Sequence, residues 1–120
     1  MSWDVELVCD CCRRPIELPY NFKDGGTYPI GGTNLATLNI TYNYSRHLLQ
    51  GLGIPFENLK NMTPEQAEPY LQKAINYLGT DADSNYWEAT KGNAGYALNI
   101  LLKWVKYAIE KNLSCHFEIY

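Results

Sequence analysis

The sequence predicts an α+β domain in which a small antiparallel sheet of 3–4 strands is packed on one face by two main helices. Segments near both ends of the 120-residue chain alternate between apolar and polar residues, as strands with one solvated face do. Two longer segments between them, at about 64–78 and 93–111, place apolar residues at helical spacing instead. One domain is expected at this length, so residues 1–120 are assigned to a single unit.

Three segments carry the strand pattern. Residues 3–9 alternate, and residues 16–18 resume the alternation after a polar turn, which predicts a β-hairpin over 3–19. Residues 36–44 are rich in β-branched and aromatic side chains, which favours another strand. Residues 113–119 alternate again and complete the predicted sheet.

The two main helices have recognisable ends. Thr63 and Gln66 have the spacing of a capping box at the start of the first helix, and Gly79 ends it. Asn93 is expected to cap the second helix. A cluster of capping residues also suggests a short helix over 85–90.

Composition and charge exclude several classes of protein. Hydrophobic residues make up 46% of the chain and charged residues 19%, which excludes a wholly disordered chain. The formal net charge of −3 argues against a nucleic-acid partner, because phosphate-binding surfaces are basic. No apolar run has the length of a membrane span, and residues 1–4 do not resemble a signal peptide. We therefore expect a cytoplasmic protein without a membrane partner.

Three of the four cysteines crowd into one predicted turn. Cys9 and Cys12 have the C-x-x-C spacing of a zinc knuckle, and Cys115 would join them if the last strand lies beside the first. The fourth zinc ligand would then be His47 or Cys11. The alternatives are three thiols in an exposed turn with one core cysteine and no cofactor, or a redox role for the same thiols.

A second candidate site lies on the polar face of the strand over residues 36–44 and just after it. Carboxamides are depleted in strands, yet Asn39 and Asn43 share one face with Thr41 between them. Tyr44 lies beside them, and Arg46 could bind a phosphate or carboxylate. These residues would suit a ligand with amide-like or base-like edges. The alternatives are an ordinary solvated sheet face, or carboxamides that fix the long loop over 20–34.

A third candidate combines Trp87 with the helix start at Asn93. An aromatic ring next to free backbone amides could hold a nucleotide. In the structural alternative, Trp87 fills the core and Asn93 only caps the helix. The glycine-rich stretch at 25–33 matches neither a Walker loop nor a dinucleotide-binding fingerprint, so it is expected to form turns.

Several blocks from residue 25 onward resemble a family of small uncharacterised phage and prophage proteins with a GGTY…GGT…LNITYNYS…YWEAT-GNA pattern. The matching blocks are Gly25–Tyr28, Gly31–Thr33, Leu38–Ser45, Tyr86–Thr90 and Gly92–Ala94. The family's N-terminal turn usually lacks cysteines, so a zinc site would not be a shared feature. The resemblance implies a phage or prophage setting inside a bacterial host cell, and no activity.

These observations predict a non-enzymatic small binding module for a small polar ligand, with a nucleotide as one candidate. The residues expected to bind it are Asn39, Thr41, Asn43, Tyr44, Arg46, Trp87 and Asn93. A protein–protein interaction or inhibitory protein acting on a host factor is the main alternative, since the chain has ten tyrosines and three tryptophans. A small hydrolase using Arg46, His47 and Glu88 is a lesser alternative, because no motif orders those groups.

Overall fold

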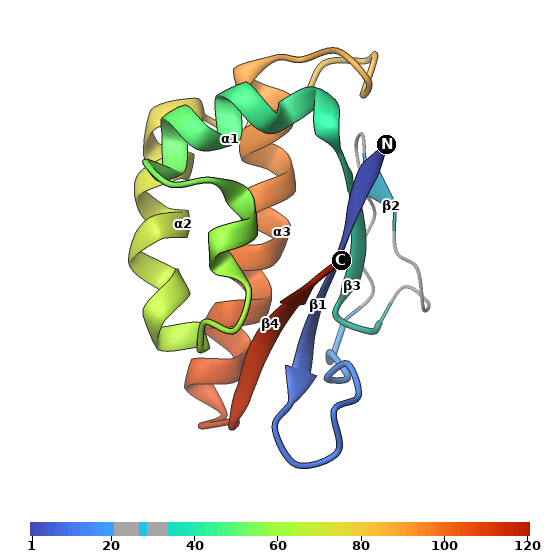
Figure 1. Ribbon diagram of the computed structural model, residues 1–120, viewed down its shortest axis with the longest axis vertical. Coiled ribbons are helices and arrows are strands. Elements are labelled where there is room, and N and C mark those ends of the chain that lie inside the picture. The colour runs from blue at the N-terminus through green and yellow to red at the C-terminus, as the bar shows by residue number, and fades with distance from the viewer. Residues whose placement is uncertain (21–26, 29–33) are drawn as a thin grey trace.

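The computed structural model describes residues 1–20, 27–28 and 34–120. Four antiparallel strands form one sheet in the order β2-β3-β1-β4, so β1 lies between β3 and β4 (Figure 1). The strand bounds are Ser2–Cys9 for β1, Thr27–Tyr28 for β2, Thr37–Thr41 for β3 and Cys115–Ile119 for β4. In the β1–β4 pair, Cys9 lies opposite Cys115.

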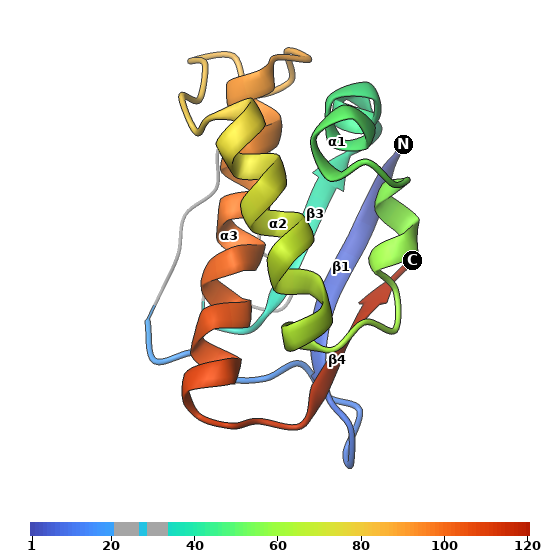
Figure 2. The same cartoon turned by 90° about the vertical axis from the view of Figure 1, so that its left-hand side faces the viewer.

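Three helices lie on one face of this sheet, which confirms the predicted α+β class and its layering (Figure 2). They are α1 over Ser45–Leu52, α2 over Pro64–Leu78 and α3 over Lys91–Glu110. Two short 3₁₀ helices, η1 over Tyr42–Tyr44 and η2 over Phe56–Leu59, flank α1. No helix among the described residues is both long and apolar enough to cross a bilayer.

The core lies between the helices and the sheet. Alternate residues of β1 and β4 face it, and the predicted apolar stripe of α3 covers them. Trp104 and Phe117 are among the largest fully buried side chains of this core. The helices therefore hide one side of the sheet, and the polar side chains of the strands lie on the other.

The boundaries of α2 agree with the sequence prediction. Thr63 and Gln66 exchange the two hydrogen bonds of a capping box, with distances of 3.2 and 3.0 Å. Gly79 follows the helix with a φ of 75°, a left-handed conformation that glycine adopts without strain. Both signals are local, which explains why they could be read from the chain alone.

The predicted hairpin over 3–19 is confirmed only as a turn, because the Ile16 amide donates to the Leu7 carbonyl but no second strand forms there. The chain turns back after β1, but residues 15–18 make only isolated bridges, Val8 with Pro15 and Glu17 with Leu35. Pro15 has no N–H to donate, and β3 and β4 already flank β1 in the sheet. The strand predicted over 36–44 is also shorter, because Thr41 caps η1 and ends β3.

Two predictions at the start of α3 are wrong. Residues 85–90 form turns and bends instead of a short helix. The helix begins at Lys91, and Thr90 caps it by accepting a hydrogen bond of 3.1 Å from the Asn93 amide. Asn93 lies inside the first turn, where its side chain is free to serve another purpose.

Candidate functional site: an aromatic loop between two helices

The polar strand residues singled out in the sequence are used inside the protein. Asn39 is buried and donates hydrogen bonds of 2.7 Å to Ser2 Oγ and to Asp4 Oδ1 on the neighbouring strand β1. Thr41 is buried and accepts a hydrogen bond of 3.2 Å from the Asn43 amide. The Asn39 side chain therefore joins β3 to β1, and the Thr41 side chain marks the end of β3.

The residues after β3 reach across to the segment between α2 and α3. Asn43 Nδ2 donates to the Trp87 carbonyl at 3.0 Å, and His47 Nε2 lies 2.8 Å from the Ala89 carbonyl. The Tyr44 hydroxyl, which is fully buried, donates to the Tyr86 carbonyl. Three side chains from η1 and α1 thus bind three carbonyls more than 40 residues away in the sequence.

Asn93 holds the same segment from the other side. Its Oδ1 accepts a hydrogen bond of 2.7 Å from the Asp83 amide, and its Nδ2 donates to the Asn85 and Glu88 carbonyls at 3.1 and 3.0 Å. The side chain is completely buried. One carboxamide therefore satisfies three backbone groups, which explains the burial of a polar residue at the start of α3.

We call residues 81–90 the aromatic loop. Its own side chains shape it further, because Asp83 Oδ1 accepts from the Asn85 amide at 2.9 Å and Asn85 Oδ1 accepts from the Trp87 amide at 3.2 Å. Trp87 and Tyr86 are 58% and 47% exposed. The loop lies at the end of the molecule shown uppermost in Figure 1.

The structure brings part of the predicted site together. The backbone of the aromatic loop is bound by Asn43, Tyr44 and Asn93. Trp87 is itself part of the loop, and its ring is exposed. Arg46 is exposed on α1, while Asn39 and Thr41 lie within the sheet. The alternative in which Trp87 fills the core does not fit its exposure.

Two members of the loop site were not among the predicted residues. His47 was considered only as a zinc ligand or a catalytic group, and its ring holds the Ala89 carbonyl. Tyr86 could have been identified from the sequence, because Tyr86 and Trp87 are the only large apolar side chains in the polar run from Asp81 to Lys91.

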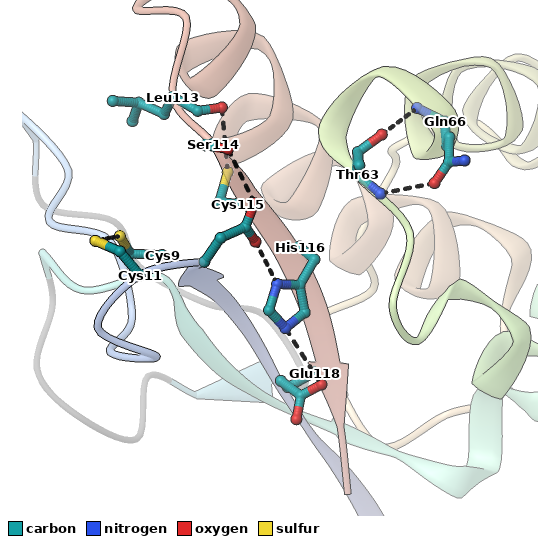
Figure 3. Close-up of polar contacts among 10 residues, drawn as sticks. Cys9, Cys11, Thr63, Gln66, Leu113, Ser114, Cys115, His116 and Glu118 are labelled. Carbon is teal, nitrogen blue, oxygen red and sulfur yellow. Dashed lines mark hydrogen bonds and ion pairs between the residues drawn. The ribbon is translucent and has the colours of Figure 1, made fainter.

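The cysteines form a second cluster, in the turn after β1. The sulfur atoms of Cys9, Cys11 and Cys12 lie within 4.8 Å of one another. Figure 3 shows the Cys9 and Cys11 sulfurs together, 3.2 Å apart, and Cys115 on β4 away from them. Cys115 is buried, and burial raises the pKa of its thiol to about 11. Cys11, and not Cys115, therefore lies close to Cys9 and Cys12.

The turn also lowers the pKa of one thiol. Backbone hydrogen bonds from Cys12 and then a hydrogen bond from the Cys11 side chain bring the pKa of Cys9 down to about 7. Asp10 in the same turn points to β4, where His116 Nδ1 lies 2.6 Å from its carboxylate and Ser114 donates at 3.0 Å. These hydrogen bonds, above all the one from His116, hold the pKa of Asp10 below its usual value.

Two of the three groups of the hydrolase alternative, His47 and Glu88, are hydrogen-bonded within the chain. His47 uses one ring nitrogen on the Ala89 carbonyl, and Glu88 Oε1 accepts from Asn85 Nδ2 at 3.4 Å. For His47 to donate to that carbonyl, its proton must be on Nε2. The geometry thus assigns His47 and Glu88 to the loop, while Arg46 is exposed on α1.

Two pockets lie elsewhere on the described surface. One of about 350 Å³ is polar and lies between the turn after β1, the start of α2 and the start of β4. The other, of about 450 Å³, is lined by Trp3, Tyr42, Ser45, Glu57, Ile119 and Tyr120. Neither is lined by a residue of the aromatic loop.

Comparison with protein-family models, with curated proteins and with solved structures gives no match for this chain.

Proposed function

We propose that this protein is a non-enzymatic binding module whose partner is a protein and whose recognition surface is the aromatic loop. The observation that carries the proposal is the exposure of Tyr86 and Trp87 on a loop that the rest of the chain fixes by side-chain hydrogen bonds. Tyrosine and tryptophan are the residues that most often dominate the energy of protein interfaces. This is the protein-interaction alternative of the sequence analysis.

The fixed backbone of the loop supports this function. An exposed loop loses conformational freedom when it binds, and that loss weakens binding. Here Asn43, Tyr44 and Asn93 already restrict the loop in the free protein. The loop therefore loses most of its conformational entropy during folding. The rings of Tyr86 and Trp87 can then contact a partner with little further loss of entropy.

The charge of the loop indicates the kind of partner. Asp81, Asp83 and Glu88 are exposed, and the loop has no lysine or arginine before Lys91. Charges of opposite sign across an interface speed association and select the partner. Lysine and arginine side chains also stack on tryptophan and tyrosine rings. We therefore infer a partner that presents a basic segment. The phage or prophage setting implied by the family resemblance would place it among bacterial host proteins.

The experiment is a comparative pulldown from the lysate of the native cell. The baits are wild type, Trp87→Ala and a matched control, Leu49→Ala, which removes a 48% exposed apolar side chain from α1. We expect a stoichiometric protein on the wild-type and Leu49→Ala baits that falls at least about tenfold on Trp87→Ala, as for an interface hot spot. Its retention should also fall as salt rises, because opposite charges are screened. Equal recovery on all three baits, or no stoichiometric protein at all, would reject the proposal.

A second candidate function, binding of a small polar ligand, is supported by the pocket beside Trp3. Trp3 and Tyr42 pack edge to face there with ring centroids 4.6 Å apart, and Glu57 adds a carboxylate. Aromatic rings with one carboxylate suit a small organic cation. Titration with choline, followed by tryptophan fluorescence, should show saturable binding that Glu57→Gln weakens. A linear response in both proteins would exclude this candidate.

A further inference from the structure

We propose that Cys9, Cys11 and Cys12 form a three-thiolate site for a thiophilic cation such as Zn²⁺ or Cu⁺. The site lies in the turn after β1, at the opposite end of the molecule from the aromatic loop (Figure 1). It is therefore independent of the proposed protein interface. Soft thiolate ligands select these ions over magnesium and calcium, which prefer oxygen.

The spacing of the sulfurs fits a single ion. With metal–sulfur bonds of about 2.3 Å at tetrahedral angles, bound sulfurs lie about 3.8 Å apart. All three sulfurs lie within 4.8 Å of one another, and the Cys9–Cys11 pair is at 3.2 Å. Binding would then require that pair to separate by only about 0.6 Å, which rotation of exposed side chains can supply.

The backbone of the turn is already in place. The Arg13 amide donates to the Cys9 carbonyl at 2.8 Å, and the Cys9 amide donates to the Arg14 carbonyl at 2.9 Å. Asp10 is tied to β4 through Ser114 and His116. The carboxylate is thus directed to β4, and the three thiols gather in the same turn without it.

Two arginines next to the turn suit a negatively charged site. Three thiolates and one divalent ion leave a net charge of −1, and Arg13 and Arg14 follow directly in the sequence to offset it. Each coordinating thiol releases its proton to solvent, so binding strengthens as pH rises.

Cys115 does not belong to this ligand set. It is buried in the core between sheet and helices, whereas Cys11 and Cys12 are exposed. A Zn²⁺ ion on the three thiolates would keep its fourth position for water, and Cu⁺ would need no fourth ligand. The ligand set therefore differs from the one predicted from the C-x-x-C spacing.

The experiment is a titration of the reduced, metal-free protein with Zn²⁺ and, without oxygen, with Cu⁺. Native mass spectrometry gives the stoichiometry, and competition with a chelator gives the affinity. We expect one ion per chain for at least one of the two metals. Cys9→Ser, Cys11→Ser and Cys12→Ser should each weaken it by more than about 100-fold, beyond the effect of losing an outer-shell partner.

Cys115→Ser is the matched control and should bind the ion as tightly as wild type. Circular dichroism of every variant checks that the fold is kept, which is expected because the three cysteines lie in or beside a surface turn. The proposal is overturned if neither metal binds at one equivalent. It is also overturned if Cys11→Ser binds as well as wild type, or if binding depends on Cys115.

Discussion

Asn93 lies near the start of a helix, but its side chain binds a loop instead of capping the helix. Its carboxamide lies inside the first turn of α3 and bonds three backbone groups of the aromatic loop. The position next to a helix start suggested a cap, but Thr90 fills that role. The loop partners lie 5 to 10 residues before Asn93, in a segment with no regular structure that could be foreseen.

Replacing Asn93 should loosen the aromatic loop. Asn93→Ala leaves the Asp83 amide and the Asn85 and Glu88 carbonyls without their partner, and we expect a loss of about 2–3 kcal/mol in the free energy of unfolding. Chemical denaturation measures the loss, and hydrogen exchange at the Asp83 amide should become faster. Asn43→Ala, which removes one exposed hydrogen bond, should cost less than about 1 kcal/mol. Equal stability of Asn93→Ala and wild type would contradict this role.

The stability of the protein is expected to depend on pH through the Tyr44 hydroxyl. Burial raises the pKa of its hydroxyl to about 12, above the usual value of 10 for the unfolded chain. The unfolded protein therefore loses this proton first as pH rises. The stability linked to Tyr44 is fully present below pH 10 and is lost as the pH rises through about 12.

Tyr44→Phe tests both features of that hydroxyl. At neutral pH we expect a loss of about 1 kcal/mol, because the Tyr86 carbonyl loses its hydrogen bond. Between pH 10 and 12 the stability of the variant should decline less steeply than that of wild type. Urea denaturation at a series of pH values measures both. Parallel declines would mean that Tyr44 is not the group that titrates.

The segment that follows α2 packs so closely on the first turns of α3 that glycine is required at two positions of that helix. A Cβ built at Gly95 would lie 1.7 Å from the Gly79 carbonyl oxygen, and one at Gly92 would lie 1.8 Å from the Asp81 carbonyl oxygen. Both contacts are with backbone, which cannot rotate away. The chain entering the aromatic loop is thus pressed directly onto the first turns of α3.

Gly95→Ala should destabilise the protein, although alanine favours a helix by about 1 kcal/mol over glycine. The forced shift of the Gly79 backbone is expected to outweigh that gain and give a net loss of about 1–3 kcal/mol. Lys103→Ala, at an exposed position of the same helix, should change stability by less than about 0.5 kcal/mol. Thermal and chemical denaturation decide the sign. A stabilised Gly95→Ala would contradict the close approach.

The elements with local signals were predictable from the sequence. The capping box at Thr63, the glycine after α2 and the apolar stripe of α3 each depend on residues within a few positions. The second strand of the predicted hairpin over 3–19 does not form, because β3 and β4 pair with β1 over long range. The shape of the aromatic loop could not be predicted either, because it depends on residues more than 40 positions away in the sequence. These residues are Asn43, Tyr44 and His47.

The whole molecule separates its two candidate sites. The aromatic loop lies at one end, where η1, α1 and the start of α3 meet, and the cysteine turn lies at the other end of the sheet (Figures 1 and 2). The core between them consists of the helices and one face of the sheet. Two polar residues that suggested a ligand site in the sequence have structural roles instead. Asn39 connects β3 to β1, and Asn93 supports the aromatic loop.

Photo-crosslinking from position 87 asks directly whether the aromatic loop contacts a protein partner. A photoreactive phenylalanine, which keeps an aromatic ring at position 87, replaces Trp87 in one protein and Leu49 in a second, and both are irradiated in lysate of the native cell. Crosslinked peptides then locate the contact on the partner.

We expect a specific adduct from position 87, mapped to a lysine- or arginine-rich segment of one protein, and no adduct of that protein from position 49. Excess unlabelled wild type should suppress the adduct, and excess Trp87→Ala should not. The claim is contradicted if the same protein crosslinks equally from both positions, or if position 87 gives no specific adduct.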